Sequence, residues 1–104
     1  MIRHCVFIRF RTNVSRNERN EIFGEIVGLR RHLSGILNVR AGTNVSPEVG
    51  MDRGFAEGFI IDFIDPMARD GYLADAEHQR VGARIVAAAE GGIAGVFVFD
   101  LDIA

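Results

Sequence analysis

The chain lacks the residues that crosslink proteins, and it lacks long hydrophobic runs. Cys5 is the one cysteine in 104 residues, so neither an internal disulfide nor a cysteine-rich zinc site can form. The start of the chain passes directly into alternating residues and has no apolar stretch of the signal-peptide kind. The longest apolar tract, residues 85–99, is interrupted by Glu90 and three glycines, which is too broken for a membrane span. We expect a cytoplasmic protein without a membrane partner.

Concentrated positive charge is also missing. All twelve residues counted as Lys or Arg are arginines, and the formal net charge is -2. The arginines are scattered, and Arg30–Arg31 is the one basic pair on a predicted helix. A nucleic-acid-binding protein needs basic residues gathered on one face. We therefore expect no nucleic-acid partner.

Length and composition predict a single globular domain. A chain of 104 residues lies near the commonest size for one domain with one core. Hydrophobic residues make up 48% of the sequence and charged residues 25%, the balance of an ordinary folded protein. No internal repeat or low-complexity segment divides it. We expect one domain over residues 1–104.

The first half of the chain predicts a strand, a helix and a second strand. Residues 2–10 place side chains on alternate faces, which is typical of a strand. Ser15 with Glu18 three residues later has the spacing of a capping box. The following apolar residues recur at helical spacing, and Gly35 is a natural stop. Residues 37–45 form a weaker strand.

The second half predicts a long strand, two helices and a last strand. Residues 54–64 form the strongest strand in the sequence. Asp65–Pro66 caps and opens a short helix, since proline suits the first helical position. A second helix begins near residue 76 and is ended by Gly91–Gly92. Residues 96–103 form the last strand.

The order of these elements predicts an α+β fold and a homodimer. The order βαββαβ is the ferredoxin-like arrangement, a four-stranded antiparallel sheet with its helices on one face. The uncovered face would carry Cys5, Phe7, Ile60 and Ile64. Two such sheets packed face to face would bury these residues and close a dimeric α+β barrel. We expect the interface to bury Phe7 or Cys5 and part of the last strand.

Residues in several of these elements resemble the stress-responsive A/B barrel (Dabb) family. The resemblance covers nearly the whole chain and depends on the order and spacing of many weak motifs. Family members are dimeric α+β barrels, mostly of unknown function and often linked to stress. The matching segments are Arg3–Phe7, Ala41–Ser46, Gly54–Phe55, Asp62–Phe63, Tyr72 with His78, and Val96–Asp100.

One member of the family, a plant polyketide cyclase, works without metal or cofactor, and the resemblance implies none here. Its tyrosine and histidine correspond to Tyr72 and His78, and its first-strand histidine corresponds to His4. Glu57 stands where that enzyme has a pocket histidine, and Ile26 stands where it has a tyrosine. Because of these departures, the resemblance does not imply its cyclase activity.

His78 is the first candidate for a functional side chain. Helical spacing with Val81 and Ile85 turns its ring toward the sheet. A histidine there could act as a general base, because its ordinary pKa lies near neutrality. Tyr72 would offer a hydroxyl to a ligand, and His4 enters the same apolar layer from the first strand. The alternative is a histidine kept for packing and satisfied by one hydrogen bond.

Glu57 is the second candidate. A carboxylate between Phe55 and Phe59 cannot be buried without a partner, because its desolvation is costly. We expect it to pair with His4 or His78, or else to lie at the solvated end of the strand. We further expect His78 to lie within hydrogen-bond reach of Tyr72, Glu57 or His4, directly or through one water, at the edge of a cavity.

Metal and haem sites are less favoured. His4, Glu57 and His78 form a ligand set that zinc or iron accepts, but nothing in their spacing requires a metal. Asp100 and Asp102 are interpreted as solvated or interface charges rather than magnesium ligands. The chain has no tryptophan, a residue that often takes part when dimeric α+β barrels handle haem. We expect no cofactor.

The sequence leaves two functions open, and both assume a homodimer. In the first, the protein binds a small aromatic or carbonyl compound. In the second, it is a cofactor-independent acid–base enzyme such as a cyclase, lyase or isomerase, with His78, Tyr72, His4 and Glu57 as catalytic residues. A simple oligomerisation scaffold would have no pocket at all.

Overall fold

A computed structural model describes residues 1–104. The predicted βαββαβ order is confirmed, with the second helical segment formed by two consecutive helices. None of the helices combines the length and apolar character needed to cross a lipid bilayer. The elements in chain order are β1 (Ile2–Ile8), α1 (Arg16–Gly28), η1 (Leu29–Arg31), β2 (Ile36–Thr43), β3 (Glu57–Phe63), α2 (Pro66–Ala74), α3 (Ala76–Ala88), η2 (Gly92–Gly95) and β4 (Val96–Asp102).

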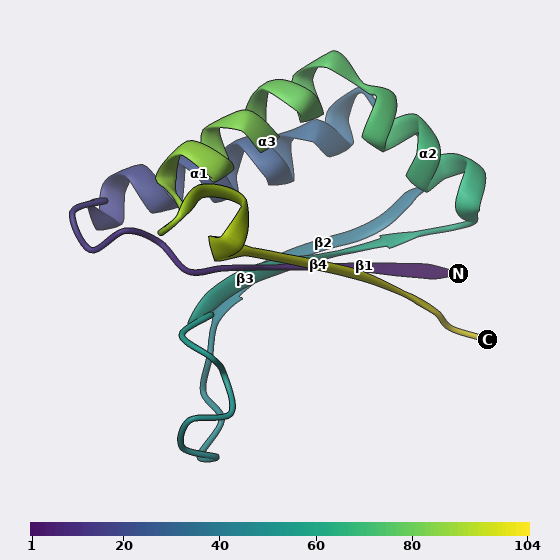
Figure 1. Ribbon diagram of the computed structural model, residues 1–104. Coiled ribbons are helices and arrows are strands. Elements are labelled where there is room, and N and C mark those ends of the chain that lie inside the picture. The colour runs from purple at the N-terminus through teal and green to yellow at the C-terminus, as the bar shows by residue number, and fades with distance from the viewer.

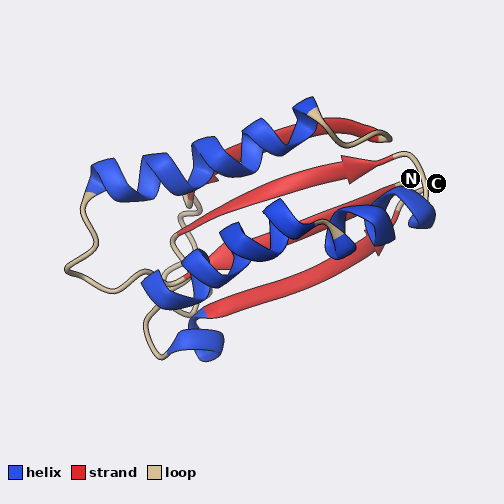
Figure 2. Cartoon of the chain, turned by 90° about the horizontal axis from the view of Figure 1, so that it is seen from above, coloured by secondary structure: helices blue, strands red, loops and turns tan.

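The four strands form one antiparallel sheet in the order β2-β3-β1-β4. Figure 1 shows the helices as a layer above the sheet, with none below it. Seen from above, α1 and α3 run side by side across the same face (Figure 2). The predicted ferredoxin-like architecture, with helices on one face only, is therefore confirmed.

The helices begin where the sequence predicts. The Ser15 side chain accepts a hydrogen bond from the Glu18 backbone N–H at 3.1 Å, and Asp65 accepts one from Ala68 at 2.8 Å. Each contact satisfies a backbone donor that a helix start otherwise leaves unpaired. Helix α1 ends at Gly28, earlier than predicted, and continues as the tighter turn of η1.

Alternate strand positions pack against the helices and form the core. On β1 these are Ile2, Val6 and Ile8, each 7% exposed or less, and Ile61 on β3 is fully buried. His4 shares this face and is 3% exposed. The alternation of side chains along β1 therefore places His4 in the otherwise apolar layer between the sheet and the helices.

The opposite side of the sheet, called here the open face, remains uncovered. Phe7 of β1 lies opposite Phe97 of β4 in the strand register. Phe97, Phe99 and Leu101 are 49%, 37% and 46% exposed. Large apolar side chains gathered on one face normally mark an interaction surface.

A segment called here the arm, residues 44–56, joins β2 to β3 and projects below the sheet (Figure 1). We predicted the third strand to begin at residue 54, but it begins at Glu57. The reason is local: Arg53 and Gly54 have φ values of 55° and 84°, which a strand does not accommodate. The Asp52 side chain also accepts a hydrogen bond from the Gly54 N–H at 2.9 Å, closing a turn.

Gly58 and Gly42 lie opposite each other on β3 and β2 and provide a matched pair of substitutions. A Cβ at Gly58 would come within 2.5 Å of the Val6 carbonyl oxygen and 2.7 Å of the Phe7 ring, whereas Gly42 has open space. We expect Gly58→Ala to lower the free energy of unfolding by about 1–2 kcal/mol, since the clash outweighs the lower chain entropy of alanine. Gly42→Ala should have no such cost. Urea unfolding of both variants tests this, and equal stabilities would contradict it.

Candidate functional site

Three of the four predicted site residues meet between the sheet and the helices. Tyr72 of α2 and His78 of α3 have ring centroids 4.1 Å apart. His4 of β1 lies 5.7 Å from the Tyr72 ring, edge to face. We call these residues the His–Tyr–His cluster. Tyr72 and His78 come from consecutive helices, whereas His4 comes from β1 at the other end of the chain, and the fold brings it to the pair.

Asp75, the residue between α2 and α3, fixes the spacing within this cluster. Its backbone N–H donates to the Tyr72 carbonyl at 3.2 Å, closing α2. Its carboxylate accepts from the His78 N–H at 2.9 Å and so caps α3. His32 also contacts both carboxylate oxygens at 3.1 Å. The hydrogen bond from His78, with help from His32, holds the pKa of Asp75 below its usual value.

The His4 ring is oriented by a carboxylate that the sequence analysis did not assign to the site. His4 Nδ1 lies 2.7 Å from Asp100 Oδ1, and Arg69 of α2 donates to the other oxygen of Asp100 at 2.6 Å. Asp100, predicted to be a solvated or interface charge, keeps 24% of its side chain exposed and also contacts His4 and Arg69. Burial alone would raise the pKa of Asp100, yet hydrogen bonds from His4 and Arg69 hold it below its ordinary value.

Two polar atoms in the cluster are buried without a hydrogen-bond partner. They are the Tyr72 hydroxyl and His78 Nδ1. Buried polar groups in folded proteins are nearly always paired, and each exception needs an explanation. We predicted that His78 would reach one of its neighbours by a hydrogen bond, directly or through one water; no direct hydrogen bond joins its ring to Tyr72 or His4, and the water-mediated contact stays a prediction. The ring centroids of Tyr72 and His78 are 4.1 Å apart, and these two atoms have no protein partner.

Burial sets the protonation states of this pair. It raises the pKa of Tyr72 far above its ordinary value, so the phenol keeps its proton. Burial lowers the pKa of His78, and the neighbouring His4 lowers it further, against opposing effects of Leu73 and Asp75. Near neutral pH the pair therefore consists of an O–H donor beside a neutral imidazole, which has one donor and one acceptor nitrogen.

Glu57 lies outside the cluster, and the predicted pairing with a histidine is wrong. In the register of β1 and β3, His4 faces Ile61 while Glu57 faces Ile8, a separation of about 13 Å along the strand. Glu57 is 5% exposed and accepts hydrogen bonds at 2.6 Å from both Arg16 and Arg19. The expectation that a buried carboxylate at Glu57 needs a charged partner is met by two arginines, Arg16 and Arg19, at the start of α1. The trio of His4, Glu57 and His78 is therefore not assembled as a metal site.

The principal cavity does not adjoin the cluster either. It has a volume of about 570 Å³ and lies between the open face and the arm. Phe7, Phe55 and Phe97 contribute to its walls, together with Arg40 and Gly58. A second cavity, of about 490 Å³, is a polar groove between α1 and α3. We predicted a cavity beside His78, and neither of these two cavities touches that residue.

Solved structures with the same fold include two of close similarity. A dimeric ferredoxin-like protein of unknown function from Jannaschia sp. CCS1 is 28% identical, with a TM-score of 0.90 and 98% of each chain covered. A protein from Arabidopsis thaliana is 19% identical, with a TM-score of 0.88 over 100% of this chain and 96% of that chain.

An enzyme also shares the fold. Hydroxynitrile lyase from Passiflora edulis is 18% identical, with a TM-score of 0.85 over 99% of this chain and 93% of that chain. No curated protein sequence matches the chain. The model of the stress responsive A/B barrel domain, Dabb, matches residues 2–103. The chain therefore belongs to the stress responsive A/B barrel domain family.

Proposed function

We propose that this protein is a homodimer in which each subunit binds a small aromatic or carbonyl compound at Tyr72 and His78. The observation that carries the ligand proposal is the pair of buried atoms, the Tyr72 hydroxyl and His78 Nδ1, that have no protein partner. Leaving such groups unpaired costs about 1–3 kcal/mol each. A ligand with a carbonyl or hydroxyl group would remove that cost, and the aromatic rings around it favour a flat apolar body.

The homodimer is supported by the open face. Its apolar side chains include Phe97 and Leu101, which are about half exposed in one subunit. Cys5 is already buried within the subunit at 4% exposure, so Phe7 and β4 are left to form the interface. The Jannaschia protein, described as dimeric, has the same fold over 98% of its chain. A symmetric pair of sheets would cover the face on both copies at once.

Acid–base catalysis is a second candidate function, favoured by the His4–Asp100 contact. His4 Nδ1 lies 2.7 Å from Asp100 Oδ1, a contact that orients the His4 ring. His78, with its pKa lowered by burial, is a neutral base beside the Tyr72 phenol. A bound carbonyl compound would thus meet a hydrogen-bond donor, a base and a second, oriented imidazole, which suits proton transfer next to a carbonyl.

One experiment tests binding and turnover together. Thermal unfolding is measured with phenol, benzaldehyde and an aromatic hydroxynitrile as probes, and aldehyde release from the hydroxynitrile is followed by absorbance. All twelve basic residues counted as Lys or Arg are arginines, so no lysine amine competes for the aldehyde. We expect at least one probe to raise Tm in proportion to the logarithm of its concentration. Aldehyde release would favour the enzyme.

Histidine substitutions provide the control. His78→Phe should abolish the rise in Tm, whereas His32→Phe should keep it, because the His32 side chain is 45% exposed and the Asp75 carboxylate still accepts a hydrogen bond from the His78 N–H without it. If no probe raises Tm in the wild type, or if His78→Phe responds as the wild type does, binding at this pair is contradicted. An ordered water that satisfies both atoms would then explain their burial.

A further inference from the structure

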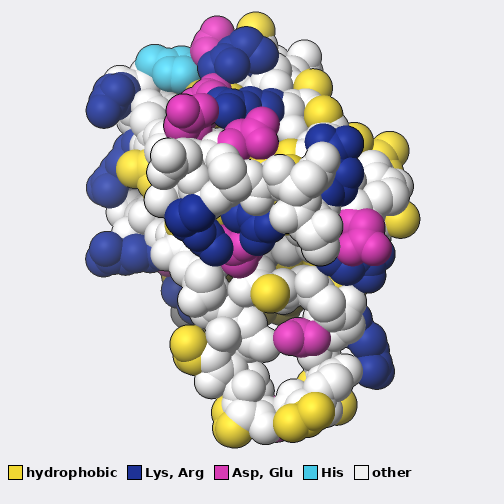
Figure 3. Space-filling view, turned by 90° about the vertical axis from the view of Figure 1, so that its left-hand side faces the viewer, with side chains coloured by type: hydrophobic (Ala, Val, Ile, Leu, Met, Phe, Trp, Pro, Cys, Tyr) yellow, Lys and Arg dark blue, Asp and Glu magenta, His cyan; other side chains and the backbone are white.

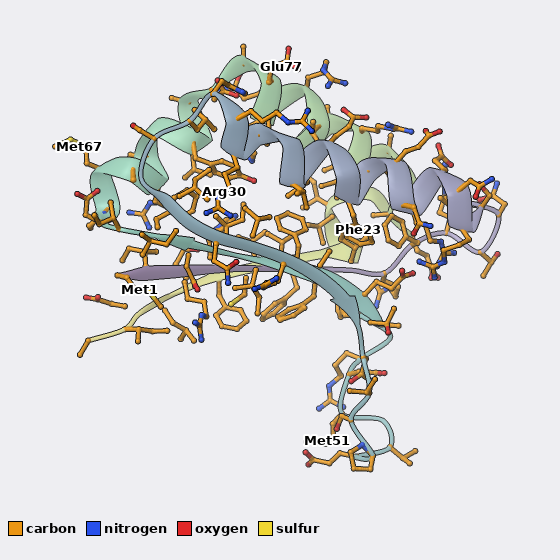
Figure 4. The ribbon with its side chains drawn as sticks, turned by 180° about the vertical axis from the view of Figure 1, so that it is seen from behind. Met1, Phe23, Arg30, Met51, Met67 and Glu77 are labelled. Atoms are coloured by element: carbon orange, nitrogen blue, oxygen red, sulfur yellow. The ribbon has the colours of Figure 1, made fainter.

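The arm carries exposed hydrophobic side chains. Val45, Val49 and Met51 are 88%, 98% and 62% exposed. Figure 3 shows hydrophobic side chains gathered at the lower end of the molecule, while charged side chains crowd the helix layer above. Met51 lies at the tip of the arm in Figure 4. Three large apolar side chains on one projecting segment indicate a surface that another molecule covers.

The arm is held in one shape by its own hydrogen bonds. Asn44 donates to the Asp52 carboxylate at 3.0 Å, and the same carboxylate accepts from the Gly54 N–H at 2.9 Å. Arg53 donates to the Gly50 carbonyl at 3.0 Å. Ordering a loop costs conformational entropy. A loop that is ordered before it meets a partner loses less entropy on binding.

The base of the arm is fixed to the open face. The Arg9 guanidinium lies over the Phe55 ring, 4.9 Å from its centroid, and donates to the Arg53 carbonyl at 3.2 Å. The Phe55 ring also packs at 5.9 Å from Phe97 of β4. The base of the arm therefore packs on the open face, and the rest of the arm projects away from the sheet. The cavity of about 570 Å³ lies between the arm and the open face.

The length and charge of the arm fit a second copy of this chain. Residues 44–56, doubled back as a loop, reach up to about 20 Å from the sheet, and two packed sheets lie only about 10 Å apart. An arm that reaches farther than this spacing is long enough to contact a second subunit packed on the open face. Glu48 on the arm and Arg40 on the open face have no ion-pair partner within the subunit. Two copies bring these opposite charges to the same interface.

We infer that the arm is a subunit clasp. In the homodimer proposed above, on which this inference depends, each arm crosses the mid-plane between the sheets. Its apolar tip packs against the other copy, and side chains of that copy enter the cavity beneath the arm. The interface then consists of the sheet face and two reciprocal arms, and the arms supply part of the binding free energy.

Charged substitutions at the tip test the clasp. Val49→Asp combined with Met51→Asp should raise the dimer dissociation constant at least tenfold, because two carboxylates would be desolvated in the interface. The control is Met67→Asp on α2, where the side chain is 81% exposed and lies far from the arm (Figure 4). The control should dissociate as the wild type does. Sedimentation equilibrium over a range of concentrations measures the three constants.

The outcomes separate the clasp from the dimer itself. A wild type that stays monomeric at every concentration overturns both the homodimer and the clasp. A wild-type dimer whose double variant has the same dissociation constant overturns the clasp alone. Circular dichroism of the dilute variants checks the monomer fold. Val45→Asp, at an 88% exposed position on the same arm, is the second variant should the double one fail to fold.

Discussion

Glu57→Leu is expected to lower the free energy of unfolding by about 2–4 kcal/mol at neutral pH. The substitution removes a 5% exposed carboxylate and leaves the 19% exposed Arg19 side chain without its anion. Arg16 is 55% exposed and can turn toward water, which keeps the loss below that of a fully enclosed pair. Glu90→Leu is the matched control, because Glu90 is 64% exposed and lies 3.9 Å from its arginine. It should change stability by less than about 0.5 kcal/mol.

The same residue should make stability depend on pH in acid. Burial alone would raise the pKa of Glu57, but hydrogen bonds from Arg16 and Arg19 lower it below the ordinary value of 4.5. The carboxyl of Glu57 then binds a proton more readily in the unfolded chain than in the folded one. The stabilisation that its ion pairs with Arg16 and Arg19 provide is therefore complete above about pH 4.5 and is lost as the pH falls. Urea unfolding between pH 3 and pH 7 should show a shallower acid loss in Glu57→Leu. An unchanged slope and an unchanged stability would contradict the ion-pair role.

Tyr72→Phe is expected to make the ligand-free protein more stable while it weakens ligand binding at least tenfold. The ring is 1% exposed and its hydroxyl has no partner, so phenylalanine keeps the packing and removes an unpaired polar group. The gain should be about 1–2 kcal/mol, or roughly 4–8 °C in Tm for each kcal/mol. Calorimetry of the free protein and titration with the probe that stabilises the wild type measure the two effects.

Tyr72→Leu separates the hydroxyl from the ring. This variant also lacks the hydroxyl, but it leaves a gap among Phe63, His4 and His78 and should lose about 2–4 kcal/mol. Binding sites typically contain residues that lower the stability of the ligand-free protein but contribute to ligand binding. If Tyr72→Phe is less stable than the wild type, the hydroxyl is satisfied in solution and contributes to the fold rather than to ligand binding.

Much of the fold could be predicted from local chemistry. Ser15, Asp65 and Pro66 mark helix starts through hydrogen bonds and ring geometry that involve only their neighbours. The strand period placed His4 in the core layer because successive side chains alternate between faces. The spacing between Tyr72 and His78 crosses a helix junction, and the family resemblance indicated it. Each of these signals extends over only a few residues.

The partners of Glu57 and His4 could not be predicted, because they depend on how elements cross in space. Arg16 and Arg19 lie one turn apart at the start of α1, a spacing that is common on solvated helix faces. Only the direction in which α1 crosses β3 brings both to Glu57. Asp100 reaches His4 because β4 pairs with β1 in one particular register. The cavity beneath the arm likewise depends on a turn at Arg53 and Gly54 that bends the chain out of the sheet.

The two chain ends lie side by side. The Met1 amino group donates to the Ile103 carbonyl at 2.8 Å, and the Ile103 N–H donates to the Met1 carbonyl at 2.9 Å. A short linker between them would make the backbone circular without moving β1 or β4. The circle could then be opened within the arm, giving a circular permutant that keeps every strand pairing. In such a permutant the sheet and the arm would be uncoupled, so the contribution of each to subunit association could be measured separately.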